Sequence, residues 1–233
     1  MILYHGTTSD VARNVLAGEG ILPTALSRKQ SNWAIDGNHS NSRCVYLTSC
    51  YGVLYSLVAK GIQNELNGDI ATDNHASIIE INGSMLNRKQ LFHDEDFLEE
   101  HYRVNKKYTQ DEVSKRLKLY CRNMFKYDKE QDWKDSLDIR GTVAYKSTVP
   151  VEAIIRVAHI DFNNISDELS EAIYEKYTKV QLCRETHPNY GEVNKELTLW
   201  VLGKRGPHDA RPIWKDRSAI VIEENPKYAG AFK

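Results

Sequence analysis

The stretch that decides the fold is the start of the chain, Met1-Ile2-Leu3-Tyr4-His5-Gly6-Thr7-Thr8. Its apolar run, residues 2–4, predicts a short buried strand that stops at His5 and Gly6. A histidine at a strand end is polar, and a glycine beside it leaves the backbone open to a ligand. We therefore expect a binding site where this strand ends, followed by a helix near residues 9–17.

Composition limits the classes of protein to which the chain can belong. The 233 residues carry a formal net charge of −1, so no overall field draws the chain to nucleic acid, and any such binding must be local. The four scattered cysteines, Cys44, Cys50, Cys121 and Cys183, suggest reduced thiols rather than disulfides or a zinc site. With no charged leader and no apolar run of membrane-spanning length, we expect a cytoplasmic protein that does not bind membranes.

Further along the chain, strands outnumber helices. Helices are expected near residues 51–60, 110–126 and 166–179, the second behind a capping box of Thr109 and Glu112. A capping-box spacing of Thr7 and Asp10 suits the helix at 9–17. Strands are expected near residues 43–49, 76–82, 140–147, 153–160, 197–202 and 218–222. The predicted class is α+β, in one domain over residues 1–233 with a core of about 1–160 and an extension of the sheet over 161–233.

An ordered set of motifs extends beyond the first block. The segment Val45-Tyr46-Leu47 predicts a second strand, and the helix after it carries Tyr55, with Tyr51 as a competitor. Together with His5-Gly6-Thr7, this order resembles the His-Tyr-x branch of the ADP-ribosyltransferase superfamily. That branch includes diphtheria-type toxins, poly-ADP-ribose polymerases and tRNA 2′-phosphotransferases. The resemblance covers roughly the first 160 residues and implies a split antiparallel β-sheet with helices packed around it.

The resemblance also implies an NAD site. His5 would hydrogen-bond a ribose hydroxyl on the adenosine side, and Gly6, next to Thr7, would offer its backbone to the carboxamide. Tyr46 and Tyr55 (or Tyr51) would sandwich the flat, electron-poor nicotinamide ring. In and beside the polar loop of residues 27–42, Arg28, Lys29 and Arg43 are candidates to meet the pyrophosphate, and Trp33 is a candidate to close over the adenine. We expect one of these contacts rather than all of them. Each of these residues alone also suits an ordinary structural role, and the ordered set favours the functional interpretation.

The third motif departs from the family pattern. Many relatives carry a glutamate where this chain has Thr142, and we expect Arg140 two residues back on the same strand face. A threonine cannot stabilise the cation that develops as nicotinamide leaves. The departure argues against poly-ADP-ribose elongation and leaves the base to Asp138, Glu152 or a loop residue. Besides Thr142 and Arg140, the expected catalytic set contains His5 and Tyr46.

Two basic stretches with interleaved aromatic residues bear on the acceptor. Residues 103–129 suggest either a surface that binds phosphates or an amphipathic helix with a solvated face. Residues 204–217, with Trp214, suggest either a base-stacking site or a surface loop.

The acidic run at residues 93–100 matches no metal-ligand spacing, and an acidic helix N-terminus explains it better. We regard the remaining histidines as incidental.

The sequence therefore predicts an NAD-consuming mono-ADP-ribosyltransferase of the toxin or anti-phage type. NAD is its expected co-substrate, without a metal. Nucleic acid is the expected acceptor, RNA before DNA, and an antitoxin protein is an expected partner. Three alternatives stay open: modification of a protein, a tRNA 2′-phosphotransferase-like reaction, and a module that binds NAD or ADP-ribose without chemistry.

Overall fold

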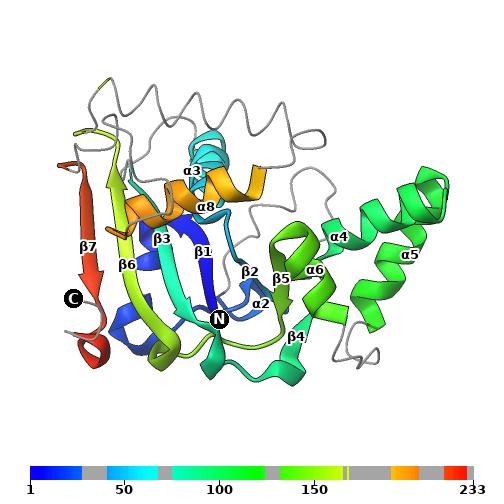
Figure 1. The fold of residues 1–233 in the computed structure, drawn as a ribbon, viewed down its shortest axis with the longest axis horizontal. Helices are drawn as coiled ribbons and strands as arrows, with labels where there is room; N and C mark the ends of the chain where they lie inside the picture. Colours follow the sequence, from blue (N-terminus) through cyan, green and yellow to red (C-terminus); the bar gives the residue numbers. More distant parts are fainter. Residues whose placement is uncertain are drawn as a thin grey trace. The chain divides into compact units, whose positions relative to one another are not determined.

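The chain folds as an α+β protein, as the sequence predicts (Figure 1). The structure, a computed structural model, describes residues 1–27, 41–67, 75–123, 132–164, 167, 190–204 and 218–229. The strands in this part of the chain are β1 (Ile2–Thr8), β2 (Val45–Thr48), β3 (His75–Asn82), β4 (Leu91–Phe92), β5 (Thr142–Tyr145), β6 (Ile154–Asp161) and β7 (Ile220–Glu224). The α-helices are α1 (Ser9–Ala12), α2 (Thr24–Ser27), α3 (Gly52–Asn67), α4 (Glu95–Glu100), α5 (Gln110–Asn123), α6 (Asp132–Arg140) and α8 (Tyr190–Val201).

The chain divides into two compact units that interleave in sequence. The first unit combines three segments, Met1–Gly20, Ser49–Ser84 and Val151–Lys233. The second unit combines Ile21–Thr48 with Met85–Pro150. In the described part of both units, no helix has the length and apolar composition needed to cross a bilayer.

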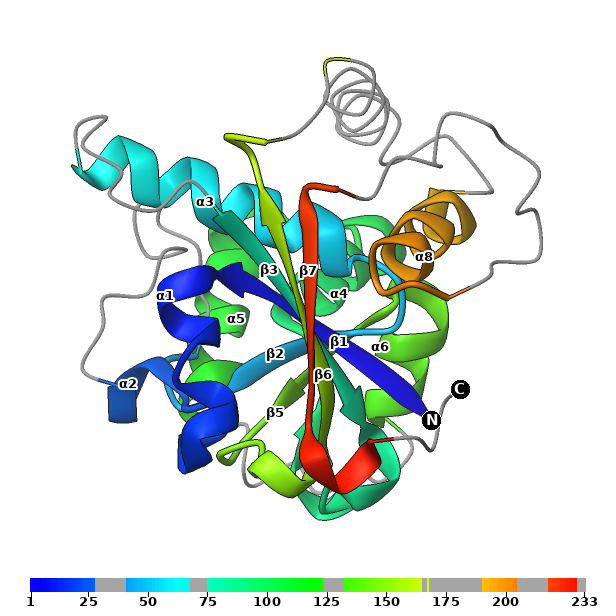
Figure 2. The same cartoon turned by 90° about the vertical axis from the view of Figure 1, so that its left-hand side faces the viewer.

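The first unit is built on four strands in the order β1-β3-β6-β7, and each neighbouring pair is antiparallel. In this register His5 lies opposite Ile79, and Ser77 lies opposite both Thr7 and His159. Figure 2 shows the twist of these strands, with β1 running diagonally behind a nearly vertical β7. Because β3 and β6 are central strands, they are buried along almost their whole length.

One face of these four strands packs against α3 and α8. The core there consists of apolar residues from all of these elements, and Thr198 of α8 donates a hydrogen bond to the carbonyl of Cys50 at 2.9 Å. Its buried members are Tyr4, Val53, Ile78, Ala158, Ile160, Leu197, Trp200, Val201 and Leu202. This core joins residues 2–8 and 49–84 to α8, which begins more than a hundred residues after residue 84.

The second unit has the strand order β4-β5-β2, again with antiparallel pairs. Helices α4 and α5 form a hairpin around a core of Cys44, Phe92, Leu98, Val113, Leu117, Tyr120 and Ala144. Helix α6 ends at Arg140, and Gly141, with φ of 71°, turns the chain into β5. A positive φ is why glycine suits this turn.

Several predicted elements are confirmed. The strands expected near residues 43–49, 76–82 and 153–160 appear as β2, β3 and β6, and the C-terminal strand extends the sheet as β7. The capping box of α5 is present, with the Thr109 N–H and hydroxyl donating to Glu112 Oε2 at 2.8 and 2.9 Å. Asp94 caps α4 by accepting from the Asp96 N–H at 3.0 Å, so the acidic run is a helix N-terminus.

Other predictions are wrong in part. The helix expected at residues 9–17 is broken into α1 and a π-helical turn, and its N-cap, Thr8, makes no side-chain capping bond. Helix α3 continues through Gly61 to Asn67 instead of ending near residue 60. The strand expected at 197–202 is the end of α8, because Leu197, Trp200 and Val201 are buried at helical spacing. The helix expected at 166–179 lies outside the described residues.

Candidate functional site

The predicted site residues fall into two groups, one in each unit. His5, Gly6, Thr7, Tyr51 and Tyr55 belong to the first unit, whereas Tyr46, Arg140 and Thr142 belong to the second. Arg28 and Trp33 lie outside the described residues, as do Trp214 and most of the second basic stretch.

Gly6 holds β1 directly against the backbone of α3. A Cβ placed on Gly6 would lie 2.3 Å from the Ser56 nitrogen, 2.5 Å from the Gly52 oxygen and 2.7 Å from the Tyr55 carbonyl carbon. Atoms cannot approach so closely, so only glycine fits here. Helix α3 therefore fills the space on the side-chain face of Gly6.

This contact fixes two aromatic side chains at the start of α3. The rings of Tyr51 and Tyr55 meet edge to face, with centroids 5.8 Å apart and an interplanar angle of 63°. Both side chains are half-exposed, and the Tyr55 N–H donates to the Tyr51 carbonyl at 3.0 Å. Strand β1 continues to Thr8, so the expectation that it stops at His5 and Gly6 is wrong, and the pair lies beside the strand rather than at its end. A half-exposed aromatic pair there is a surface that a flat heteroaromatic ring can contact.

His5 and Thr7 leave β1 on the face opposite Gly6, because side chains alternate along a strand. On that face a polar row crosses the strands, from Thr7 through Ser77 to His159. The Ser77 hydroxyl lies 2.8 Å from His159 Nδ1, and His159 Nε2 lies 3.7 Å from Glu223 Oε1. His159 is therefore not incidental, as the sequence suggested, but a buried hydrogen-bonding residue.

The order serine, histidine, glutamate also occurs in hydrolases with an activated nucleophile. Ser77, however, is 0 % exposed, so no substrate carbonyl can reach its hydroxyl. We therefore regard the row as a structural network that satisfies buried polar groups.

In the second unit, Tyr46 is held by a buried carboxyl group that the sequence did not reveal. The Tyr46 hydroxyl donates to Glu95 Oε1 at 2.6 Å, and the Asn41 N–H donates to the same two groups at 2.5 and 3.2 Å. Burial raises the pKa of Glu95 to about 8, with a further contribution from the Asp94 charge. Burial and the Glu95 carboxyl raise the pKa of Tyr46 well above its usual value, so this phenol stays protonated.

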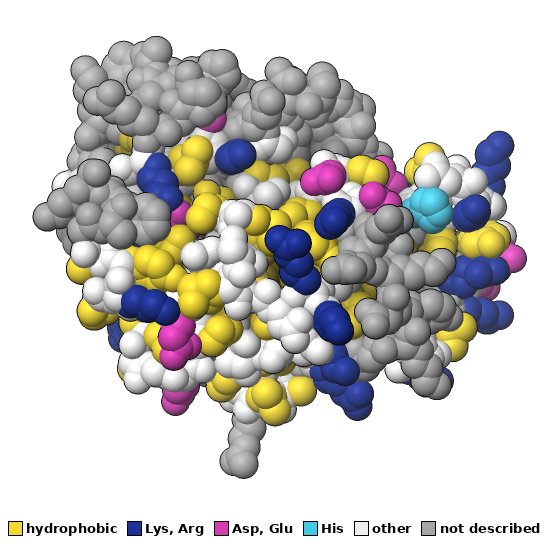
Figure 3. All heavy atoms as spheres, turned by 60° about the horizontal axis from the view of Figure 1, so that its bottom comes forward, with side chains coloured by type: hydrophobic (Ala, Val, Ile, Leu, Met, Phe, Trp, Pro, Cys, Tyr) yellow, Lys and Arg dark blue, Asp and Glu magenta, His cyan; other side chains and the backbone are white. Residues whose placement is uncertain are grey.

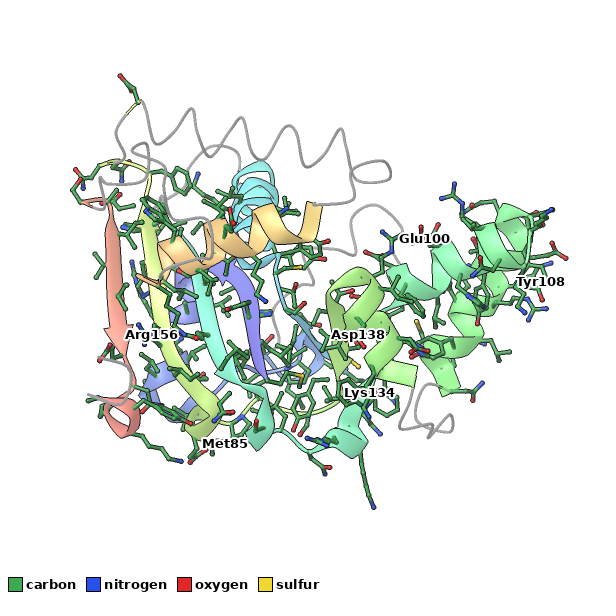
Figure 4. All side chains as sticks on the ribbon, viewed as in Figure 1. Met85, Glu100, Tyr108, Lys134, Asp138 and Arg156 are labelled. Atoms are coloured by element: carbon green, nitrogen blue, oxygen red, sulfur yellow. The ribbon has the colours of Figure 1, made fainter. Side chains whose placement is uncertain are left out.

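At the third motif the structure corrects the place of Arg140. Arg140 is the last residue of α6 and pairs with Glu100, whereas β5 begins at Thr142, so the two do not share a strand face. Of the bases proposed from the sequence, Asp138 is exposed on α6, where Figure 4 labels it. Glu152 is exposed and belongs to the first unit, whereas Thr142 belongs to the second.

Asp94 is a buried carboxyl group linked to this motif through Ser136. Burial raises the pKa of Asp94 to about 7, and the Asp96 charge adds to the rise, while the Thr142 hydroxyl and the Arg140 charge lower it. The Ser136 hydroxyl ties these elements together, because it accepts from the Asp94 N–H at 3.1 Å and donates to the Thr142 carbonyl at 2.9 Å. The link between Asp94 and Thr142 was not predicted, because a helix N-terminus already explained an aspartate at this position.

The described residues contain no group of histidine, cysteine and acidic side chains arranged to hold a metal ion. Neither a comparison of the sequence with models of protein families nor one with curated proteins gives a match.

Proposed function

We propose that this chain is an NAD-dependent mono-ADP-ribosyltransferase that releases nicotinamide and transfers ADP-ribose to RNA. The observation that carries the proposal is the fixed pairing of β1 with α3 at Gly6. It sets the half-exposed Tyr51–Tyr55 pair beside the strand that carries the His5-Gly6-Thr7 motif. The order of motifs in the sequence supports the same assignment.

The proposed reaction is dissociative. The bond between C1′ of the nicotinamide ribose and the ring nitrogen breaks, and its electron pair leaves with nicotinamide. An acceptor oxygen or nitrogen forms a new bond to C1′, and its proton passes to a base. The aromatic rings orient the nicotinamide, which lowers the barrier by holding the reacting bond in one geometry.

The first experiment measures nicotinamide released from NAD by the purified chain, alone and with total RNA, single-stranded DNA or lysate protein. Mass spectrometry then locates the added ADP-ribose. We expect release that rises with RNA, and loss of release in Tyr55→Ala. Lys227→Gln, an exposed change in the same unit as Tyr55, is the control and should keep full activity.

The outcomes separate the alternatives. Label on protein instead of RNA identifies a protein-modifying enzyme. NAD binding without nicotinamide release, whatever the acceptor, overturns the transferase and leaves a binding module.

A further inference from the structure

Aromatic side chains form a continuous ladder along the α4–α5 hairpin of the second unit. His93 and Phe97 stack with centroids 5.1 Å apart and planes inclined by 9°. Phe97 and His101 follow at 6.4 Å and 24°, one helical turn further on. Tyr102 then continues the ladder, 6.1 Å from His101 and 6.0 Å from Tyr108.

These rings are not the core of the hairpin. Val113, Leu117 and Tyr120 of α5 and Leu98 of α4 are buried and form that core. The ladder residues pack above it, and all of them are half-exposed. Part of each ring is therefore exposed to solvent along residues 93–108, from the start of α4 to the segment before α5.

The surface around the ladder is basic. Between residues 101 and 123 the chain carries seven lysine and arginine residues and two acidic ones, whereas the whole chain has a net charge of −1. Of the two acidic residues, Glu112 is engaged in its capping box. The Arg116 guanidinium lies 4.1 Å from the centre of the Tyr108 ring, so charge and ring surface coincide there.

Few acidic side chains of α4 offset the positive charge of these lysine and arginine residues. Burial raises the pKa values of Asp94 and Glu95 to about 7 and 8, and Glu100 pairs with Arg140. Only Asp96 and Glu99 remain among the acids of α4. Figure 3 shows lysine and arginine side chains gathered with a histidine at this end of the second unit, and Figure 4 labels Glu100 and Tyr108 there.

We propose that this ladder and the basic residues around it bind single-stranded RNA. Unpaired bases stack on aromatic rings, and lysine and arginine neutralise the phosphates that follow the bases. Duplexes hide their base faces, whereas RNA commonly displays unpaired loops and ends. The inference deepens the proposed function by naming where the acceptor binds, and it rests on that function only for the chemistry that follows.

The test is fluorescence anisotropy with a short fluorescein-labelled single-stranded RNA of mixed sequence, without NAD, over a series of salt concentrations. Tyr102→Leu keeps an apolar side chain but removes a half-exposed ring that meets His101 and Tyr108 at angles of 63° and 49°, and we expect about tenfold weaker binding. The double variant Lys115→Gln with Lys118→Gln should lower the salt dependence by about 0.7 per lost phosphate contact. Its matched control is Arg88→Gln with Lys89→Gln, two exposed charges of the same unit outside the ladder, which should bind as the wild type does.

A urea midpoint equal to that of the wild type shows that each variant is folded. No RNA binding by the wild type at low salt overturns the inference, as does an equal loss in the control variant. Equal affinity for single-stranded DNA of the same sequence overturns the assignment to RNA, and a preference for duplex RNA overturns stacking. Because NAD is absent, RNA binding without nicotinamide release would leave this inference standing while the proposed function fails.

Discussion

At the scale of single residues, Gly6 shows how one missing side chain sets the distance between two elements. The atoms that a Cβ would meet are all backbone atoms of α3, which cannot rotate away as a side chain can. Gly6→Ala must therefore push α3 off β1. We expect the free energy of unfolding to fall by about 3 kcal/mol or more, at the upper end of overpacking effects, in a urea titration.

Gly61 is the matched control, since it lies in the same helix and a Cβ added there would have no atom within 4 Å. Gly61→Ala should be neutral or stabilise by up to ~1 kcal/mol through helix propensity. If Gly6→Ala is as stable as Gly61→Ala, the close approach of α3 to β1 is incorrect.

At the scale of elements, the pairing of β3 with β6 contains a buried ion pair. Glu80 is 0 % exposed, and its Oε2 lies 3.1 Å from the Nε of Arg156, which Figure 4 labels. Lys204 also bonds to Glu80, and Arg156 Nη1 donates to the Leu202 carbonyl at 3.4 Å. The pair lies where the register shifts between Glu80 and Ile81, so it fixes the alignment of two strands at their irregular point.

A double-mutant cycle measures this pair. Glu80→Leu leaves the buried Arg156 beside an exposed carboxylate, that of Glu224, so it should cost about 3 kcal/mol or more of unfolding free energy. Arg156→Met leaves Glu80 paired with Lys204 and should cost less. The double variant should lose clearly less than the sum, because neither charge is then left alone. Glu224→Gln, which changes an exposed partner of Arg156 at 3.9 Å, should have little effect. Strictly additive losses would contradict the coupling.

The same elements show how far the sequence predicts the fold. Strands such as β3 and β6 were recognisable because their apolar runs are short and bounded by polar residues. Helix α6 was missed because its charged sequence buries only Trp133 and Ser136 fully, which leaves hardly any periodic signal. The end of α8 was mistaken for a strand because the apolar run at residues 197–202 is too short for its periodicity to distinguish a strand from a buried helix.

The candidate site was predictable only where a motif is local. His5, Gly6 and the tyrosines of α3 lie in such motifs, and the structure brings Gly6 and Tyr55 together. Glu95 and Asp94 gain their roles from Tyr46 and Thr142, which lie 49 and 48 positions away in the chain. Partners so far apart carry no pattern that a single sequence can reveal.

At the scale of the whole molecule, two buried carboxyl groups make stability depend on pH. The pKa of Glu95 rises from 4.5 to about 8 and that of Asp94 from 3.8 to about 7, mainly through burial. At a pH between the unfolded and the folded pKa of each group, the folded chain holds a proton that the unfolded chain has lost. The free energy of unfolding therefore falls as pH rises through that range. Below about pH 4 both states are protonated and the effect vanishes.

Each group contributes a slope of about 1.4 kcal/mol per pH unit within its window. Glu95→Gln should remove one such contribution, so its unfolding free energy should fall less steeply than that of the wild type from about pH 5 to pH 8. Urea titrations at a series of pH values measure both slopes. Glu112→Gln, an exposed change, should keep the wild-type slope; equal slopes for wild type and Glu95→Gln would contradict the buried acid.

The interleaving of the two units has a consequence for synthesis on the ribosome. All residues of the second unit have been translated by Pro150, whereas the first unit still lacks β6, β7 and α8 at that point. Until those elements emerge, β1, β3 and α3 have no partner for the apolar face that Leu197 and Trp200 later cover. The second unit can therefore complete its core on the nascent chain, while the strand bearing His5 and Gly6 reaches its final environment last.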